Sequence, residues 1–170
     1  EEVKIQIIPK NTASETPSIN YRVHRQTYGW ETIWAKDGAV SGTTGHGKRL
    51  EGISIDIKGT SYSGSVEYQT HVQSYGWMNW VADGAMSGTS GQAKRLEAIQ
   101  IKLVRKNGAD DADLKYTTHV QTHGWLDYVV DGKQSGTTGE GKRLEAIKID
   151  VPNTSCTGGI TYSVHCQTYG

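Results

Sequence analysis

The sequence predicts an all-β protein built from three copies of one unit, and three observations lead to that prediction. A heptapeptide, His71 to Trp77, recurs with small changes at 24–30 and 119–125, and a fourth copy at 165–170 stops before its tryptophan. The three tryptophans that end the full copies are 47 and 48 positions apart, a period typical of repeat architectures. Apolar and polar residues alternate within each copy, whereas no segment shows helical spacing with caps.

Composition agrees with a β protein and excludes several functions. The 170 residues include no Phe but 9 Tyr, 5 Trp and 21 Gly, a mixture of polar-edged aromatic rings and turn residues. Lys plus Arg and Asp plus Glu both number 18, so no global basic field favours a nucleic-acid partner. No apolar run approaches the roughly 20 residues that span a bilayer, so membrane insertion is not expected. Since no signal peptide is visible, we expect Glu1 and Glu2 to begin a mature or trimmed chain.

The first segment of each repeat predicts a strand with two unlike faces. In the second repeat one face is apolar or β-branched, with Val66, Tyr68, Thr70 and Val72. The opposite face carries a polar trio, with His71, Gln73 and Tyr75. The corresponding trios are His24, Gln26 and Tyr28 in the first repeat and His119, Gln121 and His123 in the third.

The second segment runs from the repeat tryptophans (Trp30, Trp77 and Trp125) to an aspartate followed by glycine. Asp-Gly predicts a hairpin turn, because glycine accepts positive φ and aspartate tolerates it. A second aromatic residue stands three positions before each aspartate, in the pairs Trp34 and Asp37, Trp80 and Asp83, and Tyr128 and Asp131. The first repeat is one residue longer here, which predicts a bulge.

The third segment begins with a Ser-Gly-Thr-x-Gly stretch, which predicts a tight surface loop, and continues into a half-buried strand. In the second repeat that strand covers 94–103, with Ile99, Ile101 and Leu103 alternating with polar residues. Arg95 and Glu97 share one face of a regular strand and are expected to form a local ion pair.

The three repeats, at about 19–65, 66–113 and 114–159, predict one domain over 1–170. A β-prism of three sheets about a pseudo-threefold axis fits this pattern, with a β-trefoil as the alternative, since either buries one continuous core. An N-terminal strand at 1–8 and a C-terminal strand at 160–170 would complete the fold by pairing and hiding sheet edges. The alternative is a chain cut from a longer array.

The only two cysteines, Cys156 and Cys166, flank a Gly-Gly bend. A cross-strand disulfide is feasible at this spacing and would indicate an oxidising compartment. The other interpretation is two reduced cysteines, of which Cys166 replaces a core valine.

The pattern argues against an enzyme, a cofactor and a metal site. Catalysis needs unlike groups with separated pKa values, and three equal copies of one site oppose that. The histidines at 24, 71 and 119 would have to converge on the axis to bind zinc, whereas the alternation places them opposite the apolar face. We expect outward or interstrand-bonded histidines instead.

The polar trios with neighbouring aromatic and acidic residues instead predict a ligand-binding surface. Apolar faces of sugars stack on aromatic rings, and their hydroxyl groups take polar contacts. A neutral polyhydroxylated ligand is therefore expected, and three weak sites would gain from effective concentration on a polymer. The candidate ligand-binding residues are His24, Gln26, Tyr28, Trp30, Trp34, Asp37, His71, Gln73, Tyr75, Trp77, Trp80, Asp83, His119, Gln121, His123, Trp125, Tyr128 and Asp131.

The ordered run from Tyr68 to Trp77, then Asp83-Gly84, Ser87 to Gly91 and Lys94 to Ile99 resembles the clostridial hydrophobic repeats with a central tryptophan (ChW repeats). The resemblance covers three repeats and both end fragments, with departures at Arg25, His123 and Cys166. It implies a secreted or surface-attached, multidomain protein of Gram-positive bacteria that binds polysaccharide, cell-wall glycan or a surface glycoprotein. Two other functions remain open: adhesion to a host glycoprotein, an immunoglobulin or a bacterial surface partner through one asymmetric patch, and an architectural spacer.

Overall fold

The computed structural model describes residues 18–58, 64–105 and 114–151, and all regular structure in these ranges is β-strand. These ranges contain no helix that is long and apolar enough to cross a membrane. The terminal strands expected at 1–8 and 160–170, and the pair Cys156 and Cys166, lie outside the described residues. Within them, the predicted all-β class is confirmed.

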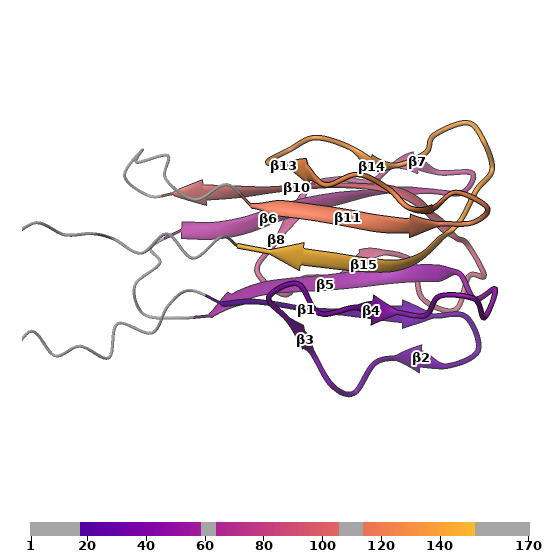
Figure 1. The fold of residues 1–170 in the computed structure, drawn as a ribbon, viewed down its shortest axis with the longest axis horizontal. Helices are drawn as coiled ribbons and strands as arrows, with labels where there is room; N and C mark the ends of the chain where they lie inside the picture. The colour runs from indigo at the N-terminus through magenta and orange to yellow at the C-terminus, as the bar shows by residue number, and fades with distance from the viewer. Residues whose placement is uncertain (1–17, 59–63, 106–113, 152–170) are drawn as a thin grey trace, which may run out of the picture.

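Six long strands run along the long axis of the molecule (Figure 1). They are β1 (Ser18–Arg25), β5 (Leu50–Lys58), β6 (Gly64–Val72), β10 (Leu96–Arg105), β11 (Lys115–Val120) and β15 (Leu144–Asp150). Each repeat contributes one antiparallel pair: β1 with β5, β6 with β10, and β11 with β15. These pairs correspond to the first and third predicted segments.

Three two-residue strands complete each repeat. The tryptophan strands are β2 (Gly29–Trp30), β7 (Gly76–Trp77) and β12 (Gly124–Trp125). The strands before the Asp-Gly turns are β3 (Ala35–Lys36), β8 (Val81–Ala82) and β13 (Val129–Val130). The Ser-Gly strands are β4 (Ser41–Gly42), β9 (Ser87–Gly88) and β14 (Ser135–Gly136).

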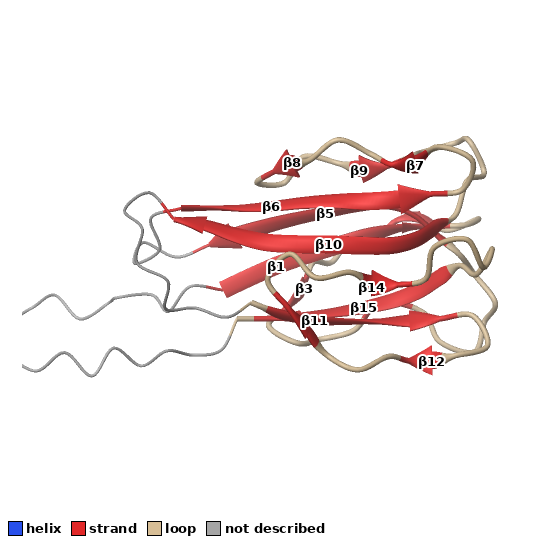
Figure 2. Ribbon diagram, turned by 90° about the horizontal axis from the view of Figure 1, so that it is seen from above, coloured by secondary structure: helices blue, strands red, loops and turns tan. Residues whose placement is uncertain are grey.

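Each long pair is the centre of a five-stranded sheet, and the repeats exchange their Ser-Gly strands. The sheet orders are β2-β1-β5-β9, β7-β6-β10-β14 and β12-β11-β15-β4, with β3, β8 and β13 on the same edges as the tryptophan strands. Each Ser-Gly strand therefore pairs with the preceding repeat, and β4 of the first repeat pairs with β15 of the third. The exchange closes a ring of three sheets among the described residues, which is the prism-like one of the two predicted architectures. Figure 2 shows the short strands β7, β8 and β9 alongside the long strands β5, β6 and β10.

The Asp-Gly turn is present, but it does not form a hairpin. Asp37 and Gly38 both have positive φ, 41° and 82°, and Ala39 N donates a hydrogen bond of 2.9 Å to Lys36 O. Both central residues are thus left-handed, as in a type I′ turn. However, β3 before the turn belongs to the first sheet and β4 after it to the third. The hairpin prediction was wrong, because a local turn signal does not specify which sheet the next strand joins.

Only part of the Ser-Gly-Thr-x-Gly stretch is the exposed loop that the sequence predicted: its last two residues are exposed in every repeat, but its first two form a strand. Ser41, Ser87 and Ser135 are at most 2% exposed, and their strands lie against the neighbouring sheet. Gly88, for example, has φ 108°, and a Cβ atom there would lie 2.5 Å from the carbonyl oxygen of Glu51. Glycine is needed here because the two backbones approach too closely for any side chain.

The β-bulge lies at a different place from the predicted one. In the first repeat His24 is opposite Gly52 and Arg25 is opposite Leu50, so Glu51 is the additional residue. The same shift occurs at Glu97 and Glu145. The extra residue of the first repeat instead lengthens the irregular link 31–34 between β2 and β3. We call Glu51, Glu97 and Glu145 the bulge glutamates.

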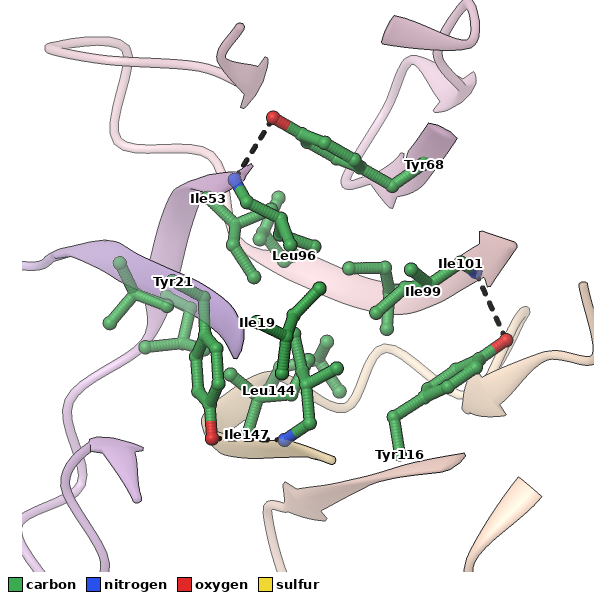
Figure 3. Packing of buried hydrophobic residues seen from close by; sticks show 14 of the residues in the cluster. Ile19, Tyr21, Ile53, Tyr68, Leu96, Ile99, Ile101, Tyr116, Leu144 and Ile147 are labelled. Atoms are coloured by element: carbon green, nitrogen blue, oxygen red, sulfur yellow. Dashed lines mark hydrogen bonds between the residues drawn. The ribbon is translucent and has the colours of Figure 1, made fainter. Parts of the chain in front are cut away.

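The core lies between the three sheets, and the predicted apolar faces line it (Figure 3). Three fully buried tyrosines connect the repeats: Tyr21, Tyr68 and Tyr116. Each hydroxyl accepts a 3.0 Å hydrogen bond from a backbone N–H of the preceding repeat in the ring, on Ile149, Ile55 and Ile101 respectively. The same hydroxyls donate to the carbonyl oxygens of Ala39, Ala85 and Lys133. Burial raises the pKa of Tyr68 and Tyr116 to about 12, because the phenolate would be desolvated.

Candidate functional site

Each sheet carries a histidine, a glutamate and an arginine in contact at one end of its outer face. In the second repeat Glu97 Oε1 accepts a 2.9 Å hydrogen bond from Arg95 Nε and lies 2.7 Å from Arg95 Nη2, so the predicted ion pair is confirmed. Glu97 Oε2 lies 3.0 Å from His71 Nδ1, off the line of a hydrogen bond. Contacts of 2.8–3.2 Å recur in the other repeats, among His24, Glu51 and Arg49 and among His119, Glu145 and Arg143. We call these three groups the polar clusters.

The bulge explains why the polar clusters form. An additional residue in one strand turns a side chain that regular alternation would send elsewhere. Leu96 points into the core and Ile99 does as well, while Glu97 between them reaches the outer histidine. The three histidine side chains retain 14–19% of their exposed area. They face outward as expected, but the clusters and their neighbours cover most of each ring.

The repeat tryptophans stand beside these histidines. Each pairs across the strands with the histidine of its own repeat, and the ring centroids are 5.5 Å apart in an edge-to-face arrangement. Trp77 and Trp125 are 37% and 36% exposed, and Trp30 is half-buried. Edge-to-face packing fixes the orientation of an indole while leaving much of its face accessible.

The loop after the Ser-Gly strand of the next repeat reaches the polar cluster. Thr89 N donates a 2.7 Å hydrogen bond to Glu51 O, and Ser90 Oγ lies 3.4 Å from His24 Nε2. Thr43 and Thr137 make the same backbone contact with Glu145 and Glu97. The end of each outer face that carries the polar cluster is therefore built from two repeats. The sequence of a single repeat does not show this.

The second and third members of each predicted trio are not on the strand. β6 ends at Val72, and residues 73–75 form a turn in which Ser74 has φ 71°. Gln73 N donates to Arg95 O (2.9 Å), and Tyr75, 55% exposed, donates from its hydroxyl to Gln92 (2.9 Å). The turns with Gln26 and Tyr28 and with Gln121 and His123 are equivalent, and His123 Nε2 lies 3.1 Å from Glu140. The expectation of one continuous polar face was wrong, because the alternation continues in the sequence beyond the end of the strand.

The second aromatic residues lie at the other end of each sheet. Trp80 and Tyr128 are 40% and 52% exposed, and Trp34 is half-buried. Because β8 pairs with the start of β6, Asp83 lies near Val66, five strand residues from His71, or about 16 Å. In the second and third repeats the predicted residues therefore form two groups rather than one compact site. In the first repeat Arg22 lies within 5.2 Å of the ring centres of both Trp30 and Trp34 and links the two groups.

The aspartates have a structural role at the start of the long strands. Asp83 Oδ1 accepts a 3.0 Å hydrogen bond from Val66 N, and Asp37 Oδ1 accepts one of 2.9 Å from Ile19 N. Asp131 N donates to Leu114 O in the third repeat. A carboxylate held by the backbone in this way fixes the turn and has less capacity left for a ligand.

Sequence reasoning missed the cations beside the aromatic rings. The Arg22 guanidinium lies 5.2 Å from the centre of Trp30 and 4.7 Å from that of Trp34. Lys102 lies 4.5 Å from Trp80, and Lys148 lies 4.4 Å from Trp125. These three side chains lie on the same outer faces as the histidines, so the strand alternation was the signal that could have found them.

The described residues contain no group of three histidine, cysteine, aspartate or glutamate side chains that could hold a metal ion. An open hollow on the first repeat is lined by residues 31–36, 39 and 40 with Arg25. Ile33 and Val40 at this hollow are 82% and 48% exposed.

Fold and surface together define a threefold, strand-exchanged β repeat protein with aromatic residues and cations on three outer sheet faces. The family model for Clostridial hydrophobic W (ChW) matches three times, at residues 24–59, 71–105 and 119–153, and the chain belongs to this family. ChW repeats commonly occur in surface proteins. Comparison with curated proteins and with solved structures finds no match for the chain.

Proposed function

We propose that the protein is a non-catalytic, extracellular module that binds carbohydrate or cell-wall glycan through up to three pseudo-equivalent sites. The observation that carries the proposal is the set of fixed, partly exposed aromatic rings repeated on three outer faces. Trp77, Trp80 and Tyr75 in the second repeat are each 37–55% exposed although they are large and apolar. Exposed aromatic rings beside fixed polar groups are typical of sugar recognition.

The arrangement favours binding over catalysis. In each polar cluster the carboxylate is shared between a histidine and an arginine of the same repeat, so the ionisable groups are committed to one another. Three copies of one arrangement also supply three similar affinities rather than one catalytic centre. On a polymer, three weak sites on one rigid body act together through effective concentration.

Secretion or attachment to the surface of a Gram-positive bacterium, beside further domains of a larger protein, belongs to the same proposal. Family membership supports it, because ChW repeats commonly occur in surface proteins. An extracellular location also suits polymeric glycans as ligands.

The test is binding to a broad glycan array and to isolated Gram-positive cell walls. We expect Tyr75→Ala and Trp80→Ala each to weaken retention about tenfold, with thermal unfolding unchanged, because both rings are exposed. Val104→Ala removes a similarly exposed aliphatic side chain, 37% exposed, and is the matched control. If the intact protein binds neither the array nor the walls, the proposal is wrong.

A second candidate function is adhesion to a protein, supported by the asymmetric hollow of the first repeat. Ile33, 82% exposed, lies in the longer link of the first repeat and exposes apolar area there that the shorter links of the other repeats do not present. Val40 adds to this area, although Met86 at the equivalent position of the second repeat is similarly exposed. A mutational scan with a hot spot at Ile33 and Val40, and no effect at the aromatic rings of the other two repeats, would favour this function.

A further inference from the structure

The centre of each outer face is one cross-strand pair, and this pair differs among the repeats. Arg22 is opposite Ser54 in the first sheet, Gln69 is opposite Gln100 in the second, and Thr117 is opposite Lys148 in the third. The polar clusters and repeat tryptophans around these pairs are the same in all three sheets. The three faces thus share the polar cluster and the repeat tryptophan and differ in the charge of the central pair.

In the first repeat the central charge is held without a counter-ion. The Arg22 guanidinium lies within 5.2 Å of the ring centres of both Trp30 and Trp34, and its Nε is buried without a hydrogen-bond partner. Among residues 18–58, 64–105 and 114–151, no carboxylate forms an ion pair with Arg22. A partly desolvated guanidinium with unused donors is unfavourable until an oxyanion meets it.

The third repeat also has a cation beside an indole without a carboxylate partner, and the second repeat does not. Lys148 lies 4.4 Å from the ring centre of Trp125 and has no carboxylate partner within the described part of the chain. Lys102 of the second repeat lies 4.5 Å from Trp80, but Glu67 neutralises it at 2.9 Å. The central pair of that repeat, Gln69 and Gln100, is satisfied internally by a 2.5 Å hydrogen bond.

We propose that the first and third outer faces bind an acidic sugar, with Arg22 and Lys148 contacting its carboxylate and the neighbouring indoles contacting its ring. The inference rests on the proposed glycan-binding function and replaces its neutral ligand with a carboxylated one at two of the three faces. A guanidinium pairs with a carboxylate through two parallel hydrogen bonds, and an ammonium pairs with it as a point charge. A pyranose ring beside the carboxylate uses the indole, which a polyol phosphate without a sugar ring cannot do.

The test compares polymers that differ only in the charge of the ligand. Polygalacturonate and its fully methyl-esterified form share one backbone, and the ester has no free carboxylate. Affinity electrophoresis and calorimetry with the full chain are expected to show about tenfold tighter binding to the acid, weakening as salt is raised. Hyaluronate and alginate extend the carboxylated set, and a poly(glycerol phosphate) tests phosphate as the alternative oxyanion source.

The decisive variant is Arg22→Gln with Lys148→Gln, because glutamine already occupies both equivalent positions in the second repeat, at 69 and 100. We expect its affinity for the acid to fall to that for the ester, with an unchanged thermal unfolding midpoint. Lys58→Gln with Lys133→Gln removes the same charge from exposed side chains away from these centres and is expected to keep the preference.

Each alternative outcome excludes a different statement. Equal binding to acid and ester, unaffected by the double variant, overturns the charge inference and leaves glycan binding intact. Preference for the poly(glycerol phosphate) over every carboxylated polymer overturns the carboxylate assignment. Binding to the array or to cell walls without binding to any of these polymers overturns the inference alone. If none of the polymers, the array and the cell walls is bound, both the inference and the proposed function are wrong.

Discussion

The hydroxyl of Tyr21 accepts a hydrogen bond from the backbone N–H of Ile149, 128 residues further along the chain. Tyr68 and Tyr116 repeat this contact between the other pairs of repeats. The three tyrosines therefore hold the ring of sheets together from inside, while the exchanged Ser-Gly strands hold it from outside. This double connection is what positions three similar outer faces on one rigid body.

Removing one of these hydroxyls tests the connection. Tyr68→Phe would leave the N–H of Ile55 and the carbonyl of Ala85 without their buried partner. The expected loss is about 1–3 kcal/mol in the free energy of unfolding, measured by denaturant titration of tryptophan fluorescence. Tyr75→Phe, in which the hydroxyl removed is on a 55% exposed side chain, should stay within about 0.5 kcal/mol. Equal losses from both variants would contradict the structural role of the buried hydroxyl.

Alkaline pH should destabilise the fold through the same residues. Burial raises the pKa of Tyr68 and Tyr116 from 10.0 to about 12, so the unfolded chain loses these protons first. Their stabilising contribution is complete below pH 10 and is lost as the pH rises from about 10 to 12. The expected slope is about 1.4 kcal/mol per pH unit for each tyrosine in that window. Unfolding midpoints between pH 8 and 12 measure it, and Tyr68→Phe should have a smaller slope than the unmodified chain.

The strand exchange depends on glycine at one position of each repeat. A Cβ atom at Gly88 would lie 2.5 Å from Glu51 O and 2.9 Å from Gly52 Cα, and φ there is 108°. Gly88→Ala is therefore expected to cost more than about 3 kcal/mol or to prevent folding, since backbone atoms must move. Gly91→Ala is the control: its φ is 72°, but nothing lies within 4 Å, so only about 1–2 kcal/mol of backbone strain is expected. Thermal unfolding followed by circular dichroism distinguishes them, and a Gly88→Ala protein as stable as Gly91→Ala would contradict the observed packing.

The bulge glutamates should contribute more to the free energy of unfolding than surface ion pairs do. Glu97 is 6% exposed and contacts both Arg95 and His71, so Glu97→Gln leaves the guanidinium partly buried without its counter-ion. We expect a loss of about 3 kcal/mol in denaturant unfolding. Glu67→Gln removes the partner of Lys102 where both side chains are over 30% exposed, and should cost at most about 1 kcal/mol. A loss at Glu67 as large as that at Glu97 would exclude the cluster as a stabilising element.

The sequence was sufficient to predict the fold class, the repeat and the buried face of each long strand, because these depend on local alternation. Val66, Tyr68, Thr70 and Val72 are all buried as predicted, and His71 faces the other side. The alternation failed at Gln73 and Tyr75 because nothing in a period of two marks where a strand ends. Positive φ at Ser74 ends it, and serine is not a residue whose presence predicts that conformation.

Long-range features were beyond the reach of the sequence for a different physical reason. The environment of Ser87 depends on strand exchange with another repeat, so its polar side chain predicted an exposed loop although it is 2% exposed. The bulge at Glu97 changes which side chains share a face, and it is caused by register rather than by composition. Trp80 was correctly placed near the surface, but its contact with Lys102 requires two strands to be aligned.

The first repeat has an ion pair where the second repeat has packed uncharged side chains. The end of the second sheet contains Val72, Thr70 and Met78. The equivalent residues of the first sheet are, in the same order, Arg25, Val23 and Glu31. Glu31 N donates to Val23 O as Met78 N does to Thr70 O, which establishes the equivalence. The hydroxyl of Ser87 contacts Thr70, whereas Ser41 Oγ contacts the Glu31 carboxylate.

The combined change Val23→Thr, Arg25→Val and Glu31→Met therefore gives the first repeat the residues that the second repeat has at these positions. Arg25 and Glu31 are both partly buried and 3.6 Å apart, and replacing such a pair by packed apolar residues is often stabilising by about 1–4 kcal/mol. Glu31→Met alone should instead destabilise, because it leaves Arg25 and the Ser41 hydroxyl without their partner. Opposite signs for the triple and single variants in denaturant titration are the expected result. A triple variant that is less stable than the single one would show that the longer link at 31–34 requires the charged pair.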